Sequence, residues 1–497
     1  PSAPTAGTRD GVVEGRKEHG LDVFLGIPFA APPVGALRWK EPQAVAGWTG
    51  VRKADAYAAS CMQKPGIPVA MGGATGALSE DCLYLNVWTP QAGSAGKRPV
   101  MMWIHGGALV FGSGNIALYD GSAYARRGAV VVTINYRMGA LGFFSHPAID
   151  GADASAPVNY GLFDQVAALR WVRDNIAAFG GDPGNVTIFG ESAGAQSVLA
   201  LYASPLAKGL FQRGIAQSPY AIPSHTRARA REVSVRVASA VGLEGAGATA
   251  AQLRTVPAAR FFALGDQGPT LAPSFIVGDA ALPQPILDTF RKRKQAQLPL
   301  IIGSNSDEAT VAPAFGVDPA ELVKKLRAGK FLLKALYPGV GDDAQLGREA
   351  VRDVVFTAYA RQVAYLHSRS APVWRYYFDH VQQGQQGKVP GVGHGGEIPF
   401  VMDPPDDCGC LVAPLTAADR DFARQVGDYW YAFALSGDPG VTAAPAWARD
   451  SVRKAQLLEF GGSTEGRIVP REDFMDARLN AFMLTSKAAG ALMKARN

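Results

Sequence analysis

The chain alternates short apolar runs with segments of helical periodicity. The apolar runs are nearly continuous, or rich in β-branched and aromatic residues, as is typical of strands buried in a sheet. We predict strands at Val100–Ile104, Val130–Asn135, Asn185–Phe189, Ile215–Gln217, Leu298–Gly303 and Val373–Phe378. Between the second and third of these runs, a helix is predicted because apolar residues recur at helical spacing, at Leu162, Val166, Leu169, Val172 and Ile176.

This strand–helix–strand order predicts an α/β fold with a large, mostly parallel sheet flanked by helices. The helix is expected to stop at Gly180-Gly181, and residues 182–184 (Asp-Pro-Gly) have the chemistry of a turn. Residues 26–35 are too rich in glycine and proline for a long helix, so they predict a small antiparallel region before the main sheet. No repeat or long linker is present, and we predict one domain over residues 1–497 with helical insertions.

Composition narrows the class of protein. Hydrophobic residues make up 47% and charged residues 19% of the 497 residues, which is a globular balance. A net charge of +6 is dilute over this length and does not indicate a nucleic-acid partner. No apolar run reaches the ~18 residues of a membrane helix, and the nearest, Pro99–Val110, is broken by His105, Gly106 and Gly107.

The clearest chemical signal is the pentapeptide Gly190-Glu191-Ser192-Ala193-Gly194, which fits the pattern G-x-S-x-G. It follows a predicted strand and precedes the apolar helical segment Ala195–Tyr202, so the serine is expected on a sharp strand-to-helix turn with its hydroxyl exposed. The glycines are needed because side chains there would collide. The pattern predicts a nucleophilic Ser192.

A serine nucleophile needs a base. In hydrolases with this turn the chain order is serine, acid, histidine, and of the seven histidines only His367, His380 and His394 lie late enough. His394 lies in a glycine-rich loop after a predicted strand and is the favoured base. The acid is expected after the strand Leu298–Gly303, where the local pattern leaves both Asp307 and Glu308 open.

The loop that begins His105-Gly106-Gly107-Ala108 follows another predicted strand. Glycines there let backbone N–H groups turn toward a developing negative charge, so Gly107, Ala108 and Ala193 are the predicted oxyanion donors. A rival interpretation starts from residues 112–117, which match G-x-G-x-x-[GA]. A dinucleotide site needs that pattern directly after a strand, and seven residues intervene here.

Together with further segments, these motifs make the sequence resemble the type B carboxylesterase (cholinesterase-like) family of the α/β-hydrolase fold, in its bacterial form. The resemblance extends over nearly the whole chain. The segments that carry the resemblance, besides Gly190–Gly194, are residues 24–39, 79–87, 135–137, 159–164, 179–183, 303–308 and 394–400. The most specific is Ser79-Glu80-Asp81-Cys82-Leu83-Tyr84-Leu85-Asn86-Val87.

The resemblance implies roles for further residues. It selects Glu308 as the acid, so that the triad is Ser192, Glu308 and His394. It implies that the Ser218 hydroxyl lies near this triad and that Glu191 tunes it electrostatically. It also implies structural ion pairs between Arg38 and Glu80 and between Arg137 and Asp164, and a disulfide between Cys61 and Cys82.

Two departures from the family bear on the substrate. Ala108 stands where many relatives have a third glycine, and its methyl group narrows the pocket. The Cys61–Cys82 loop contains no tryptophan to hold a quaternary ammonium group, so a choline ester is not expected. The residues expected to line a pocket for an apolar acyl or alcohol group are Leu109, Val110, Phe111 and Phe315.

The remaining cysteines, Cys408 and Cys410, are separated by one residue, and both a labile disulfide and two free thiols are open. A disulfide favours an oxidising compartment, so a secreted or periplasmic protein is expected. No metal or other cofactor is expected. Two basic runs, at Arg227–Arg236 and Arg291–Lys294, are either solvated helix faces or attract an anionic substrate.

The function predicted from the sequence is ester hydrolysis through an acyl-enzyme intermediate on a small-molecule ester. Amide, carbamate or polyester cleavage by the same triad is an alternative. A binding protein on an esterase scaffold is another, disfavoured by the intact triad. The pattern predicts neither the physiological ester nor the oligomeric state.

Overall fold

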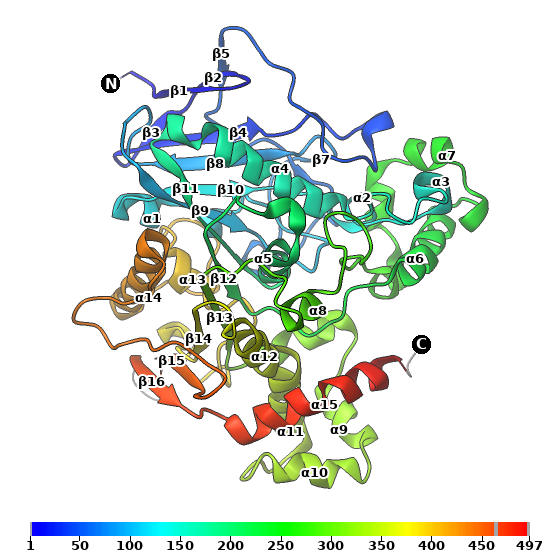
Figure 1. The fold of residues 1–497 in the computed structure, drawn as a ribbon, viewed down its shortest axis with the longest axis vertical. Helices are drawn as coiled ribbons and strands as arrows, with labels where there is room; N and C mark the ends of the chain where they lie inside the picture. The colour runs from blue at the N-terminus through cyan, green and yellow to red at the C-terminus, as the bar shows by residue number, and fades with distance from the viewer. Residues whose placement is uncertain (1, 462–465, 495–497) are drawn as a thin grey trace.

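A central sheet of 11 strands runs through the computed structural model, which describes residues 2–461 and 466–494 (Figure 1). The strand order is β16-β15-β14-β13-β12-β11-β9-β10-β8-β4-β3. Every neighbouring pair from β10 to β15 is parallel, whereas the strands at both edges pair antiparallel. The predicted mostly parallel sheet is confirmed.

The strands of this sheet are β3 (Arg16–Glu18), β4 (Leu21–Pro28), β8 (Tyr84–Thr89), β9 (Arg98–Ile104), β10 (Val130–Ile134), β11 (Gly181–Glu191), β12 (Arg213–Gln217), β13 (Leu300–Asn305), β14 (Val373–Phe378), β15 (Gln456–Gly461) and β16 (Arg467–Glu472). Two small sheets stand apart from it, one of β1 (Thr5–Thr8), β2 (Gly11–Glu14) and β5 (Val51–Lys53), the other of β6 (Ser60–Cys61) and β7 (Leu78–Ser79).

The α-helices are α1 (Ser122–Arg127), α2 (Gly139–Gly142), α3 (Pro147–Asp150), α4 (Tyr160–Asn175), α5 (Ala193–Ala203), α6 (Arg227–Ala240), α7 (Ala250–Thr255), α8 (Ile286–Arg291), α9 (Pro319–Lys325), α10 (Gly329–Ala335), α11 (Asp343–Arg352), α12 (Ala358–His367), α13 (Ile398–Met402), α14 (Ala417–Ser436) and α15 (Asp476–Lys494). Over the described residues, none of these helices is both long and apolar enough to cross a bilayer.

Two hydrophobic cores cover the two faces of the sheet, and β9 shows why its sequence is continuously apolar. Val100, Met102 and Ile104 face the core beneath α4, α5 and α12. Met101 and Trp103 point the other way, into the core beneath α1, α13 and α14. Because side chains alternate along a strand, a strand covered on both faces needs apolar residues at every position.

Two details of the sequence prediction were wrong. Residues 182–184 do not separate the helix from the strand but lie within β11, where the pairing jumps from Gly181 opposite Arg98 to Val186 opposite Val100. The turn chemistry therefore forms an irregularity in the strand. The start of the turn-rich segment, residues 26–28, belongs to β4 of the main sheet, and the small N-terminal sheet is mixed because β2 pairs parallel with β5.

Helices are inserted between successive parallel strands of the sheet. One insertion, α6 to α8, lies between β12 and β13, and another, α9 to α12, lies between β13 and β14. In Figure 1 the second insertion extends below the sheet, and α10 forms its lowest part.

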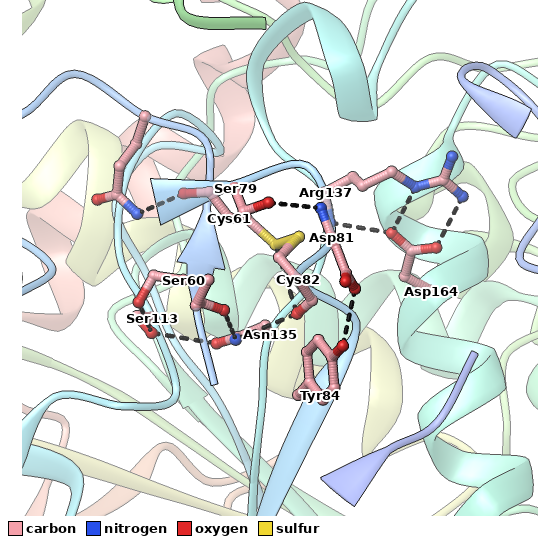
Figure 2. The surroundings of a disulfide bond; sticks show 12 residues. Ser60, Cys61, Ser79, Asp81, Cys82, Tyr84, Ser113, Asn135, Arg137 and Asp164 are labelled. Atoms are coloured by element: carbon pink, nitrogen blue, oxygen red, sulfur yellow. Dashed lines mark hydrogen bonds and ion pairs between the residues drawn. A yellow bond between two sulfur atoms is a disulfide. The ribbon is translucent and has the colours of Figure 1, made fainter. Parts of the chain in front are cut away.

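The disulfide between Cys61 and Cys82 ties the N-terminal loops to the sheet (Figure 2). The Cys82 carbonyl accepts a hydrogen bond from Asn135 Nδ2 at 3.2 Å. Two residues further on, Arg137 makes a bidentate ion pair with Asp164 of α4, with N–O distances of 2.9 and 2.8 Å. The Arg38–Glu80 ion pair expected from the resemblance is present as well.

The Arg137–Asp164 pair gives a first prediction, because both side chains are buried. Asp164→Ala leaves a guanidinium without its counter-charge, and we expect a loss of about 3–5 kcal/mol in the free energy of unfolding measured in urea. Asp428→Ala, which removes the exposed partner of Arg127, is the control and is expected to cost less than about 1 kcal/mol. Equal losses in the two variants would contradict the prediction.

Candidate active site

Ser192 lies at the turn between β11 and α5, where the backbone conformation is unusual. Its φ is +56° and its ψ is −119°, which is a region that non-glycine residues rarely adopt. Flanking glycines make the turn possible: a Cβ atom at Gly194 would lie 2.0 Å from the Ile104 carbonyl oxygen, and one at Gly190 would lie 2.5 Å from it. The strained turn is held because β9 and β11 pair in register beside it.

A chain of hydrogen bonds joins the three predicted triad residues. His394 Nε2 lies 2.7 Å from Ser192 Oγ, and His394 Nδ1 lies 2.5 Å from Glu308 Oε2. His394 comes from the loop after β14, and Glu308 begins the turn after β13. Three side chains more than 80 residues apart in the sequence therefore meet at the carboxyl ends of parallel strands, where sites of α/β proteins lie.

Glu308 is held in place by the groups around it. Its Oε1 accepts hydrogen bonds from the Asn305 backbone N–H at 2.7 Å and from the Ser218 hydroxyl. This places Ser218 beside the triad, as the resemblance implied. Asp307, the other acid that the local pattern left open, instead uses its backbone N–H to bond Val392 O and makes no contact with His394.

Two further carboxyl groups lie close to the imidazole. Glu191 Oε1 is 3.2 Å from His394 Nε2, and Glu397 lies one turn beyond His394, bonded weakly by Asn305 Nδ2 at 3.4 Å. Burial raises the pKa of Glu191 and of Glu397 above the usual carboxyl range. The negative charge of Glu308 raises both pKa values further. Glu397 carried no signal of its own in the sequence analysis.

The neighbouring carboxylates also change the pKa of the His394 imidazole. Burial by itself lowers the pKa of His394, but the negative charges of Glu191 and Glu308 outweigh it and raise the pKa above the ordinary value for histidine. His394 is therefore poised to accept and hold a proton.

The loop after β9 presents its backbone toward Ser192. A Cβ atom at Gly106 would lie 2.6 Å from the Glu191 carbonyl oxygen and 3.1 Å from Ser192 Cβ, so only a glycine allows this approach. Gly107 has a φ of +109° and Ala108 a φ of +54°, so the alanine occupies a conformation that costs it about 1 kcal/mol. Within the described chain, the N–H groups of Gly107 and Ala108 donate no hydrogen bond to any other residue.

These groups open onto a cavity of about 1270 Å³. Of the four predicted pocket residues, Val110, Phe111 and Phe315 line it, whereas Leu109 does not. Leu109 is instead buried in the hydrophobic core on one face of the sheet. Its φ is +64°, and its carbonyl accepts a hydrogen bond from Gly139 N at 2.6 Å.

Much of the cavity wall comes from the insertions and was not predicted. Phe261, Phe262 and Leu264 come from the first insertion, and Val412 and Cys410 from the loop after α13. The sequence left open whether Cys408 and Cys410 form a disulfide or are two free thiols. In the structure they form a disulfide.

Comparison with known proteins agrees with this architecture. The family model described as "Carboxylesterase family" matches residues 2–334 and 343–475. The chain is 35% identical to fumonisin B1 esterase of Sphingopyxis macrogoltabida over 92% of this chain and 87% of that protein. It is 36% identical to para-nitrobenzyl esterase of Bacillus subtilis (strain 168), over 91% of this chain and 94% of that protein.

Solved structures show the same fold. A para-nitrobenzyl esterase superposes with a TM-score of 0.82 at 32% identity, covering 97% of this chain and 99% of that one. A Geobacillus stearothermophilus carboxylesterase superposes with a TM-score of 0.81 at 31% identity, covering 96% and 99%. Fold and site thus define an α/β hydrolase. The chain belongs to the carboxylesterase family, and it is a carboxylic ester hydrolase.

The contact at Gly194 gives a second prediction. In Gly194→Ala the new methyl group meets the Ile104 carbonyl oxygen, so β9 and the serine turn cannot keep their positions. We expect a loss of at least about 3 kcal/mol in the free energy of unfolding, measured by denaturation. Gly341→Ala, where a Cβ atom meets nothing within 4 Å, is the control and is expected to change stability by less than about 1 kcal/mol. A well-folded, fully stable Gly194→Ala protein would refute this account of the turn.

Proposed function

We propose that the chain is a serine carboxylesterase in which Ser192 is the nucleophile, His394 the general base and Glu308 the residue that orients His394. The observation that carries this is the chain of hydrogen bonds from Ser192 Oγ through His394 to Glu308. Ser192 attacks the ester carbonyl while His394 takes its proton. His394 then gives the proton to the leaving alcohol, and water cleaves the acyl-enzyme by the same route.

The N–H groups of Gly107, Ala108 and Ala193 stabilise the oxyanion in this proposal. The N–H groups of Gly107 and Ala108 donate to no group of the described chain. Ala193 is the first residue of α5, so its N–H has no partner within the helix. Backbone donors aimed at the same point lower the barrier without reorganising during the reaction.

The cavity favours an ester with a sizeable apolar group, since Val110, Phe111, Phe262 and Phe315 line it. Amide, carbamate and polyester bonds remain alternatives for the same triad. A panel of substrates that varies the bond type, acyl length and alcohol bulk separates them.

We also infer an oxidising compartment, periplasmic or extracellular, for this protein. Both pairs of cysteines are bonded in the structure, and structural disulfides persist where thiols are not kept reduced. Mass spectrometry of protein prepared from its native host, with free thiols blocked at lysis, tests this inference.

A third prediction concerns the nucleophile. Ser192→Ala is expected to lower kcat/KM on a short p-nitrophenyl ester by roughly three orders of magnitude or more, since the other groups cannot form the acyl-enzyme. Labelling by a fluorophosphonate probe is expected to disappear as well. Ser239→Ala, an exposed serine on α6, is the control and should change neither. Near-full activity of Ser192→Ala would refute the proposal.

A fourth prediction follows from the Glu191 charge. The base must be neutral to accept the serine proton, so activity rises as the pH passes the pKa of His394. Glu191→Gln removes a charge that raises this pKa, so the acidic limb of the kcat/KM profile should move to lower pH, by on the order of one unit. Glu191→Asp, which keeps the charge, is expected to stay closer to the parent profile. A shift to higher pH in Glu191→Gln would contradict the assignment.

A further inference from the structure

Helix α10 carries large apolar side chains on both of its sides. Leu333 and Leu336, just beyond its end, pack inward against the small core formed by Val323, Tyr337, Leu346 and Ala350. Phe331 and Leu332 point outward, and 79% and 77% of their respective surfaces are exposed. A helix on the surface of a globular protein normally has polar residues at its outer positions. Two neighbouring large apolar residues this exposed indicate a surface that meets another apolar phase.

Several cations lie close to these apolar residues in the sequence. Between residues 318 and 337 the chain has five basic residues and two acidic ones. Lys324 pairs with Glu321 and Lys330 with Asp343. The other three, Lys325, Arg327 and Lys334, are exposed and form no ion pair with any residue that the structure describes. Leu326, 44% exposed, lies among them.

This surface lies away from the proposed catalytic residues. In Figure 1, α10 forms the lower end of the molecule, beyond α9 and α11, while α5 and the strand ends near Ser192 lie in the middle. None of the residues from 318 to 337 lines the cavity. The α10 segment and the cavity wall are therefore formed by different residues.

We propose that the outer surface of this segment, which we call the α10 face (Lys325, Leu326, Arg327, Phe331, Leu332 and Lys334), binds the surface of an anionic phospholipid membrane. Phe331 and Leu332 enter the boundary between headgroups and acyl chains, as the apolar side of an interfacial helix does. Lys325, Arg327 and Lys334 lie at the level of the headgroups and attract their negative charge.

The charges argue against other partners. A second copy of the chain docked on the same face would bring two sets of unpaired cations together, which is unfavourable. A nucleic acid would match the charge, but only Phe331 offers it a stacking face, and the aliphatic Leu326 and Leu332 offer it neither a stacking face nor a hydrogen bond. An anionic lipid surface satisfies the cations and the apolar side chains together.

The test is flotation of the full-length protein with vesicles of two compositions, phosphatidylcholine alone and an equal mixture of phosphatidylglycerol and phosphatidylcholine. We expect binding to the mixed vesicles, weaker binding at raised salt, and little binding to phosphatidylcholine alone. Absence of binding to the mixed vesicles, or equal binding to both compositions, overturns the proposal.

Two variants separate the contributions. Lys325→Ser/Arg327→Asn/Lys334→Ser is expected to weaken binding to the mixed vesicles about a hundredfold, at about 1 kcal/mol per cation. Asparagine replaces Arg327 because the backbone there has a φ of +48°, which asparagine tolerates. Phe331→Ser/Leu332→Ser is expected to weaken binding at least about tenfold.

Matched controls alter the same kinds of residue elsewhere. Lys97→Ser/Lys292→Ser/Lys294→Ser removes three exposed lysines, and Leu435→Ser/Val452→Ser removes two exposed apolar side chains. Both controls should bind vesicles as the parent does, and all four variants should keep the parent's turnover of a soluble ester, which shows that they are folded. Losses of binding as large in the controls as in the α10 variants would overturn the proposal.

Discussion

The pairing of β9 with β11 is the constraint on which the site depends. Gly190 lies opposite Ile104 in this parallel pair, and Gly194 leaves no room for a side chain beside the Ile104 carbonyl. The chain leaves β9 directly after Ile104, so the loop with Gly106 and Gly107 begins within van der Waals distance of the serine turn. The distance from the Ser192 hydroxyl to the backbone N–H groups of this loop is therefore set by the pairing of two adjacent central strands of the sheet.

The carboxyl groups of Glu308, Glu191 and Glu397 lie near the His394 imidazole, and their surroundings differ. Glu308 has hydrogen-bond partners for both oxygens, from Asn305, Ser218 and His394, so its carboxyl group is held in one orientation. Glu191 and Glu397 are as deeply buried but have weaker partners, and burial favours their protonated forms. The three carboxyl groups therefore differ in how firmly hydrogen bonds hold them beside the imidazole.

The sequence predicted best those features that depend on neighbouring residues along the chain. The strand Val373–Phe378 was predicted with its observed bounds because every residue of β14 is buried. The strand predicted at Leu298–Gly303 begins later and extends to Asn305, because polar Ser304 and Asn305 continue the ladder with β14. Hydrophobic pattern cannot reveal such residues. The local pattern also left Asp307 and Glu308 open, since the choice depends on which side chain faces a loop 86 residues away. Phe261 and Phe262 reach the cavity from the first insertion and Val412 from the loop after α13, and no motif marks either segment. The single domain over residues 1–497 stays a prediction.

The second insertion connects the candidate active site to the outer surface of the protein, and these two ends are under different constraints. The segment between β13 and β14 begins with Glu308, contributes Phe315 to the cavity and then runs outward to α10. The family model matches the chain up to residue 334 and resumes at residue 343, so the match is interrupted between α10 and α11. Near the sheet, hydrogen bonds to Asn305 and Ser218 constrain this segment strongly. At α10 only the inward residues, such as Leu333, are constrained by packing, and the outward ones are free to be chosen for a partner. Packing within the described residues does not account for Phe331 and Leu332, because most of each side chain is exposed, and a partner surface would cover them.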